Sequence, residues 1–506
     1  MSAERLTSRR WFLGWSIAAG AGALLAACTP AAEPTKPAAA PAAAPTNTPA
    51  AAAAGKPTEA AKPAEAAKPT EAAKPAEAAK PTEAAKPAAG ATPQAFANKY
   101  TPPALTPPEG YKPATGKLEI FSWWTSGGEV EALNFLYEDF KKLNPGVEIV
   151  NSAITGGTAS GGNMKAVLQT RMMGGDAPES FQIHLGHELI DNHVVAGRME
   201  PLDDLYKNEG WDKAFPKGLI DIASWQGKPW SVPVNIHRAN VLWYNKKLFA
   251  DVGAEPPKTW DEYVAIGEKL KAKGQPLIGV AESGPGFWAH VTETILISSL
   301  GPDAYRGLFD GTTKWDDKRV TDALNTSVKL LDYANKDFLS VSWGDINDLM
   351  VAGKCASIIQ GDWTPGVLWS KGFTDFGWVP APGNSGVYDM LSDSFGLPKG
   401  VKNRDAAVNW LKVCGSKHGQ EGFNFYKGSI PARTDTDFGQ YTQYHKDASK
   451  DWTSNQIVPS IVHGAAARDS FNVDYQTAIN VLATKKNADE AQKKLVQAAK
   501  DADFKK

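Results

Sequence analysis

The chain has 506 residues, of which 54 are basic and 56 acidic, so its formal net charge is −2 at pH 7. This balance argues against nucleic-acid binding, because a nucleic-acid site needs a basic face. From Gly116 to the C-terminus, about 390 residues have the composition of folded sequence, which is too long for one core and predicts two lobes. No segment after residue 27 is apolar for long enough to span a membrane.

The first 27 residues have the layout of a secretory signal. Arg5, Arg9 and Arg10 form a charged region, and the apolar run 11–27 ends in small residues before Cys28. The run SRRWFL at 8–13 resembles a twin-arginine export signal, and LAAC at 25–28 resembles the lipobox of bacterial lipoproteins. We therefore expect cleavage, lipidation of Cys28 and attachment to the extracytoplasmic face of a membrane through this lipid anchor. The alternative is an uncleaved membrane anchor, for which the apolar run is short.

Residues 28–115 are predicted to form a tether. Within them the hexapeptide KPTEAA or KPAEAA repeats five times between Lys56 and Pro87. Such a unit has no large apolar side chain to bury against a neighbour, and a proline in every sixth position disfavours helix. We expect an extended, disordered spacer, and the alternative is a tract with no role beyond being unstructured.

The folded part alternates strands and helices along the chain. Apolar periodicity predicts strands at 117–123, 147–153 and 179–184, and helices at 129–142 and 164–173. A capping box of Thr259 and Glu262 begins a helix that reaches about residue 273. Two more helices are predicted at 406–415 and 488–502, with acidic residues or Asn at their starts and lysines at their ends. This order implies an α/β fold with a mostly parallel sheet between layers of helices.

The folded part resembles the extracellular solute-binding proteins of ABC sugar importers, in the segments VLWYNKKLFADVGAEPPKTWDEYVAIGEKL (241–270) and VAGKCASIIQGDW (351–363). It is most similar to the branch that binds glucose and galactose, in KLEIFSWW (117–124), TRMMGGDAPESFQIH (170–184), MLSDSFGLPKG (390–400) and SIVHGAAARDSF (460–471). The resemblance covers nearly all of the folded part and none of the tether.

This resemblance implies a two-lobed, periplasmic-binding-protein-like (type II) fold with three hinge crossings, near residues 232–235, 390–394 and 433–439. The implied N-terminal lobe is 116–233 with 393–435, and the implied C-terminal lobe is 234–392 with 436–506. The implied function is that of a monomeric receptor that captures a monosaccharide of the glucose, galactose or mannose type by lobe closure and delivers it to the permease subunits of an ABC transporter.

The chemistry of a sugar supports that expectation independently. A pyranose has an apolar C–H face and a rim of hydroxyls that both donate and accept, so its site must be aromatic and densely polar. The chain has 17 Trp, several of them beside polar residues. Trp225, Trp260 and Trp410 are assigned to the core, whereas Trp124 and Trp343 are expected in the cleft.

When the sugar-binding positions of the family are transferred to the matching motifs of this sequence, the resemblance implies a set of sugar-binding residues. They are Trp123, Trp124, Glu129, Thr155, Gly156, Gly157, Gln182, His184, Asn235, His237, Trp288, Trp343, Asp362, Lys399 and His463. Three of these have a plain structural alternative: Lys399 completing a loop, Glu129 as a carboxylate in the first turn of a helix, and His184 as a core imidazole.

No cofactor or metal is expected. The residues His184, His187 and His193 lie close together, but their spacing matches no zinc motif. The run TGGTASGGN at 155–163 lacks the ending of a phosphate loop and is interpreted as backbone that approaches a ligand. Cys355 and Cys414 are expected to be buried free thiols, because a twin-arginine substrate folds in the reducing cytoplasm.

Two other functions stay open at this point. A retaining glycoside hydrolase needs two carboxylates about 5 to 5.5 Å apart. Glu129, Asp362 and Asp393 are the residues that would supply such a pair. A surface-tethered, glycan-binding adhesin would also make use of the long spacer. We expect a binding protein and not an enzyme.

Overall fold

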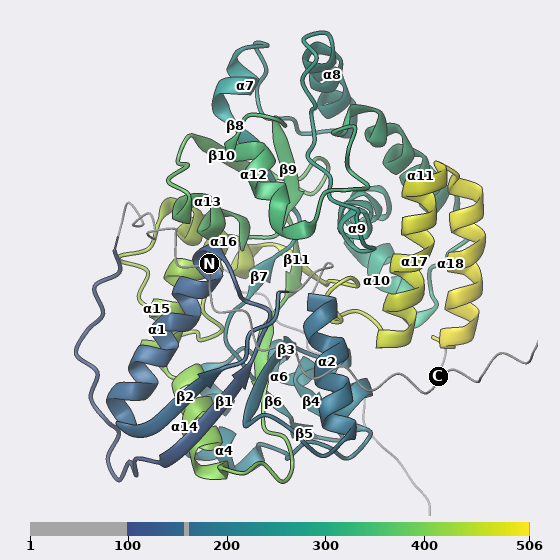
Figure 1. Cartoon of the computed structure of the whole chain (residues 1–506). Helices are drawn as coiled ribbons and strands as arrows, with labels where there is room; N and C mark the ends of the chain where they lie inside the picture. Colours follow the sequence, from purple (N-terminus) through teal and green to yellow (C-terminus); the bar gives the residue numbers. More distant parts are fainter. Residues whose placement is uncertain (1–98, 156–160, 505–506) are drawn as a thin grey trace, which may run out of the picture. The chain divides into compact units, whose positions relative to one another are not determined.

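A computed structural model describes residues 99–155 and 161–504 (Figure 1). The predicted signal 1–27, Cys28 and the repeats of the tether lie outside the described residues. The strands are β1 (Thr115–Phe121), β2 (Gly146–Asn151), β3 (Ser180–His184), β4 (Ser224–Trp225), β5 (Lys228–Pro229), β6 (Ser231–Pro233), β7 (His237–Arg238), β8 (Val241–Asn245), β9 (Ser357–Gln360), β10 (Phe376–Pro380), β11 (Val387–Leu391), β12 (Asp393–Gly396) and β13 (Gln456–Pro459).

The helices confirm the expected alternation of strands and helices. They are α1 (Gly127–Leu143), α2 (Gly162–Met173), α3 (His187–Leu189), α4 (Asp203–Asn208), α5 (Trp211–Ala214), α6 (Lys217–Ile222), α7 (Lys246–Ala250), α8 (Trp260–Lys271), α9 (Phe287–Leu300), α10 (Pro302–Asp310), α11 (Lys318–Leu330), α12 (Ile346–Val351), α13 (Thr364–Ser370), α14 (Arg404–Gly415), α15 (Lys417–Lys427), α16 (Gln443–Ser454), α17 (Asp469–Lys485) and α18 (Ala488–Ala502). In the described part of the chain, none of them is both long enough and apolar enough to cross a bilayer.

The chain forms two lobes, one built around a five-stranded sheet and the other around two three-stranded sheets. We use "N-terminal lobe" for the part with the sheet β2-β1-β3-β12-β6, and "C-terminal lobe" for the part with the sheets β10-β8-β9 and β13-β11-β7. In the first sheet β1 pairs in parallel with β2 and β3, and β12 is antiparallel to β3 and β6. The prediction of a mostly parallel sheet is wrong for β10-β8-β9, because β9 and β10 both run antiparallel to the central β8.

Three connections join the lobes, and backbone hydrogen bonds link the residues at these crossings. The first joins β6 to β7, the second is Ser392 between β11 and β12, and the third lies between α15 and α16. The Val234 N–H donates to the Asp393 carbonyl (2.9 Å), and Ile236 and Ile430 exchange two backbone hydrogen bonds (2.7 and 3.2 Å). These connections overlap the predicted crossings at 232–235, 390–394 and 433–439, and the exact lobe boundaries stay a prediction.

Local sequence signals account well for helix ends. The Thr259 side chain accepts from the Glu262 N–H while the Glu262 carboxylate accepts from the Thr259 N–H, so the predicted capping box is confirmed. The helix predicted at 488–502 is α18, with its start capped by the Asn487 side chain. Cys355 and Cys414 are free and buried, as expected.

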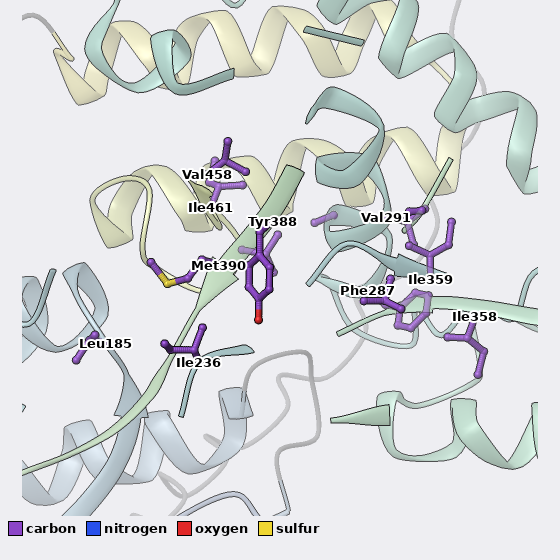
Figure 2. Close-up of a cluster of buried hydrophobic side chains, with 14 of the residues drawn as sticks. Leu185, Ile236, Phe287, Val291, Ile358, Ile359, Tyr388, Met390, Val458 and Ile461 are labelled. Carbon is purple, nitrogen blue, oxygen red and sulfur yellow. The ribbon is translucent and has the colours of Figure 1, made fainter. Parts of the chain in front are cut away.

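The hydrophobic core continues from one lobe into the other. Figure 2 shows Tyr388 and Met390 of β11 in a cluster that extends from Leu185, after β3, to Ile358 of β9. Tyr388 is fully buried. The strand that leads to the second crossing is therefore held by apolar packing, which limits where the chain can bend.

The end of the predicted tether packs against the N-terminal lobe, so the expected boundary at residue 115 is too late. Tyr100 is 7% exposed and lies 5.5 Å from the ring of Phe425. The Ala114 N–H donates to the Asn144 side chain (2.9 Å). A fragment that begins at Gly116 would lose these contacts.

Candidate functional site

A cavity of about 470 Å³ lies between the two lobes. Its walls include residues just beyond the carboxyl ends of β1 and β3, where ligands of open α/β sheets bind. It is lined by Trp123, Thr125, Ser126, Gly127, Glu129, Thr155, Gly161, His184, His237, Ser342, Trp343, Gly344, Asp345, Asp348, Trp363, Val367, Ser370, Lys371, Leu391, Asp393, Lys427 and His463.

Aromatic rings from both lobes meet around this cavity. The rings of Trp343 and Trp363 lie 5.9 Å apart, and His463 lies 5.4 Å from Trp363. On the opposite lobe, Trp123 and His184 pack edge to face at 5.1 Å. Such rings offer flat apolar surfaces to the C–H face of a planar or cyclic ligand.

Two imidazoles on the C-terminal side of the cavity, His463 and His290, are neutral. Burial lowers the pKa of His463 well below its ordinary value, and burial also lowers the pKa of His290, behind it, to about 4. His463 Nδ1 lies 2.8 Å from the Ser460 hydroxyl. A neutral imidazole has one donor and one acceptor, which suits a hydroxyl group.

Charged groups form the inner end of the cavity. His237 Nε2 lies 3.1 Å from Asp393 Oδ2, and the same carboxylate accepts from the side-chain amides of Gln182 (3.1 Å) and Asn235 (2.9 Å). Burial opposes ionisation of Asp393, but the bond from His237 and the charge of Lys427 outweigh it and lower the pKa well below the ordinary value. Asp393 is therefore a buried carboxylate that stays ionised and already has donors on both oxygens.

A buried ion pair stands beside this cluster. The Lys427 ammonium bonds the carboxylate of Glu129, and their side chains are 2% and 19% exposed. The ammonium also lies 5.2 Å from the centroid of the Trp124 ring, within the range of a cation–π contact. Glu129 therefore neutralises a cation in the site in addition to lying in the first turn of α1.

The outer rim of the cavity is more exposed to solvent than its inner end. Lys371 pairs with Asp348 at 2.6 Å, with side chains 34% and 53% exposed. The Ser342 hydroxyl donates to Asp345, which is exposed. The cavity thus grades from a buried, charged inner end to a solvated polar mouth.

The structure brings together seven of the sequence-predicted site residues. Those that line the cavity are Trp123, Glu129, Thr155, His184, His237, Trp343 and His463. Three more, namely Gln182, Asn235 and Asp362, are fully buried behind it and bond to lining residues. Gly156 and Gly157 lie outside the described residues.

Three further predicted residues also lie outside the cavity lining. Trp124 is 1% exposed and packs against Phe423 (5.1 Å) and Phe395 (5.9 Å), because consecutive residues at the end of a strand point in different directions. Trp288 is fully buried within α9, among the C-terminal-lobe core. Lys399 is exposed on the connection that follows β12, where its N–H donates to the Arg198 carbonyl.

Several lining residues were missed, among them the buried Trp363, Asp393 and Lys427. Trp363 follows Asp362 in the GDW motif, so the motif was right and the residue within it was wrong. Asp393 and Lys427 reach the cavity through partners more than 150 residues away in sequence, namely Asn235 and Glu129. No local pattern marks such pairs. Among the described residues, no group of three His, Cys, Asp or Glu is arranged to hold a metal ion.

Comparison with known proteins gives consistent matches. Residues 124–421 match the family described as bacterial extracellular solute-binding protein. An uncharacterized ABC transporter extracellular-binding protein of Pyrococcus horikoshii is 34% identical over 391 residues, covering 76% of this chain and 87% of that protein. A probable sugar-binding periplasmic protein of Rhizobium meliloti is 30% identical over 401 residues, covering 77% and 95%.

Among solved structures, a chitin oligosaccharide binding protein is similar with a TM-score of 0.67 and 20% identity, covering 77% of this chain and 99% of that one. At this identity the likeness concerns the fold alone. It confirms the predicted two-lobed α/β fold.

Proposed function

Because the chain belongs to the bacterial extracellular solute-binding protein family, we propose that it is the sugar receptor of an ABC importer and captures a monosaccharide between its lobes. Proteins of this family bind solutes for transport and are not enzymes. The receptor delivers its sugar to the permease subunits of the transporter. A glycoside hydrolase is thereby disfavoured.

The observation that carries the proposal is the composition of the cavity. Three indoles, Trp123, Trp343 and Trp363, come from both lobes, and polar groups that donate and accept lie between them. An unpaired hydroxyl or protein group in a closed site costs about 1 to 3 kcal/mol, so this density of polar groups favours a ligand with many hydroxyls. The seven lining residues predicted from the sequence, with Trp363, Asp393 and Lys427, are the proposed contacts.

A single pyranose of the glucose, galactose or mannose type is the proposed ligand. It occupies the inner end, where His237, Asp393, Lys427 and His463 are all buried. A similar protein is named for chitin oligosaccharides. The solvated mouth around Trp343 and Asp345 is where a second ring would lie if this chain also binds a disaccharide.

The N-terminal region completes the proposal. The twin-arginine signal directs export, lipidation of Cys28 anchors the mature chain to the outer face of the membrane, and the repeats of the tether extend the receptor from that face. The receptor acts as a monomer. The lobe boundaries near residues 233, 392 and 435 are also part of this proposal.

Lobe closure is the proposed mechanism. A sugar that contacts Trp123 and His184 on one lobe and Trp363 and His463 on the other pairs all its hydroxyls only when the lobes close. Ligand therefore shifts the population toward the closed form, which docks on the permease.

Calorimetric titration of the full chain with glucose, galactose, mannose, maltose and chitobiose tests the proposal. We expect one-to-one binding of at least one hexose, with the C4 epimers glucose and galactose differing in affinity. Binding of the disaccharides alone would overturn the monosaccharide assignment. Release of nitrophenol from aryl glycosides, or binding to immobilised glycans without binding to free sugars, would overturn the receptor in favour of a hydrolase or an adhesin.

A further inference from the structure

The carboxylate of Asp362 is fully buried and does not line the cavity. Its Oδ1 bonds His237 Nδ1, and its Oδ2 accepts from the Arg238 N–H (3.1 Å) and the Tyr444 hydroxyl (3.1 Å). Every one of these partners is a protein group. Asp362 is therefore fixed from several directions and acts on the cavity only through His237.

His237 has a carboxylate on each side of its ring. Nδ1 faces Asp362, and Nε2 faces Asp393 Oδ2 at 3.1 Å. Nε2 also lies 2.9 Å from the amide nitrogen of Asn235, which itself donates to Asp393. A protonated Nε2 donates to Asp393, whereas an unprotonated Nε2 would accept from Asn235. The site thus offers two hydrogen-bond arrangements that differ by one proton.

We propose that Asp362 is a positioning residue, which holds His237 as an imidazolium bridging Asp362 and Asp393 and thereby sets the charge of the sugar site. This inference rests on the proposed function only for its effect on sugar. The protonation of His237 is a property of the protein itself.

The charges around His237 support the imidazolium. Burial alone would lower the pKa of His237, but the Asp362 charge, with the bonds from Asp362 and Asp393, raises it above the ordinary value. Lys427 is the nearby cation that opposes this. The ring of Trp363 lies 5.3 Å from that of His237 and carries no charge, and His463, which senses the charge of His237, is itself neutral.

The consequence for a sugar follows from the charge count at the inner end. With His237 charged, Asp393 has a cationic partner, and the pair leaves the cavity without an uncompensated carboxylate. With His237 neutral, Asp393 keeps its charge with only amides and the more distant Lys427 to balance it. The donors and acceptors offered to hydroxyls then differ, because Nε2 turns from donor to acceptor.

Histidine proton resonances of the full chain, followed against pH, test the inference without any sugar. The chain has eight histidines, so His237→Gln identifies the resonance of interest. In the wild type we expect the pKa of His237 to lie above the ordinary histidine value. In Asp362→Asn we expect its pKa to fall by at least about one unit, since a neighbouring carboxylate shifts a pKa by about 1 to 3 units. An unchanged His237 titration in this variant would overturn the inference.

Tyr444→Phe is the matched control, because it removes another bond to Asp362 but keeps the charge. His237 should titrate in this variant as in the wild type. A shift as large as that of Asp362→Asn would mean that packing, and not the carboxylate, holds the proton, which also contradicts the inference.

Sugar titrations at pH 5.5 and 8 supply the functional readout. The loss of affinity between pH 5.5 and pH 8 should be about tenfold larger in Asp362→Asn than in the wild type, and the variant should recover at pH 5.5, one pKa unit being a tenfold change. Pure loss of folding would not recover in acid. If the wild type binds no sugar while His237 behaves as expected, the proposed function fails and the positioning role stands. If sugar binds and the variant shows no pH dependence, the positioning role fails alone.

Discussion

Trp123 and Trp124 are consecutive in the chain but serve different surroundings: Trp123 lines the cavity, and Trp124 is 1% exposed against Phe423 and Phe395. The Lys427 ammonium lies over the buried ring of Trp124, and Lys165 lies over the ring of Trp123. One residue step at the end of β1 therefore separates a ligand-facing indole from a core indole.

This separation predicts that Trp123→Ala mainly weakens sugar binding, whereas Trp124→Ala mainly lowers the free energy of unfolding. Trp123→Ala should weaken sugar binding at least tenfold and change the free energy of unfolding little. Trp124→Ala should lower the free energy of unfolding by about 3 to 5 kcal/mol, because it removes a buried aromatic side chain. Calorimetric titration and urea unfolding of both variants measure this, and equal losses of stability would contradict it.

The sequence predicts those features that depend on neighbours in the chain. The capping box of Thr259 and Glu262 needs only four residues, and the structure contains it. The direction of Trp124, in contrast, depends on Phe395 and Phe423, which lie far along the chain. Asp362 was predicted to contact sugar and Trp363 was not, for the same reason: the Asp362 carboxylate is satisfied by His237 and Tyr444, and Trp363 faces the cavity.

The Lys427–Glu129 pair predicts an asymmetry between buried and exposed ion pairs. Lys427→Met should lower the free energy of unfolding by about 3 kcal/mol, because removing one partner of a buried pair leaves the other uncompensated. Lys371→Met is the matched control, since its pair with Asp348 is exposed and should contribute less than about 1 kcal/mol. Urea unfolding of the two variants measures both changes. Similar losses of unfolding free energy would show that the Glu129 carboxylate becomes solvated when Lys427 is removed and is not left uncompensated.

Asp389 predicts a specific pH dependence of stability. It is 1% exposed, and within the described part of the chain neither carboxylate oxygen has a hydrogen-bond partner. Burial, and then the nearby Glu293, raise its pKa well above the ordinary value. The folded state therefore keeps a proton that the unfolded state releases near pH 4, so the free energy of unfolding falls as pH rises, by about 1.4 kcal/mol per unit for this group.

Asp389→Asn removes that proton linkage while keeping the side-chain shape. We expect the wild type to lose stability between pH 5.5 and 8 in urea unfolding, and the variant to lose distinctly less. His237, with its raised pKa, adds to the wild-type slope in the same direction and is unaffected by this substitution. Asp221→Asn, at an exposed carboxylate paired with Lys217, should leave the slope unchanged. A slope for Asp389→Asn equal to that of the wild type would mean that Asp389 is ionised in the folded protein.

The last prediction concerns contacts between the lobes next to the cavity. The Asn192 side chain donates to Asp469 at the start of α17 (2.9 Å), and the Asp469 N–H donates to the Asp191 carboxylate (3.0 Å). The His187 N–H donates to the Gly464 carbonyl (3.0 Å). These bonds join residues 187–192, which follow β3, to residues 464–469 of the C-terminal lobe, and the two segments come within eight residues after His184 and His463, which line the cavity.

Asn192→Ala should shift the protein toward an open form. One hydrogen bond contributes about 1 kcal/mol, so the closed population, and with it the apparent sugar affinity, should fall about fivefold. Small-angle scattering in the absence of sugar should give a larger radius of gyration for the variant, and saturating sugar should restore the wild-type value. Asn480→Ala removes a bond to Glu282 within the C-terminal lobe and should change neither quantity. Scattering and affinity identical to the wild type in Asn192→Ala would show that this contact does not hold the lobes together, and that closure depends on the sugar alone.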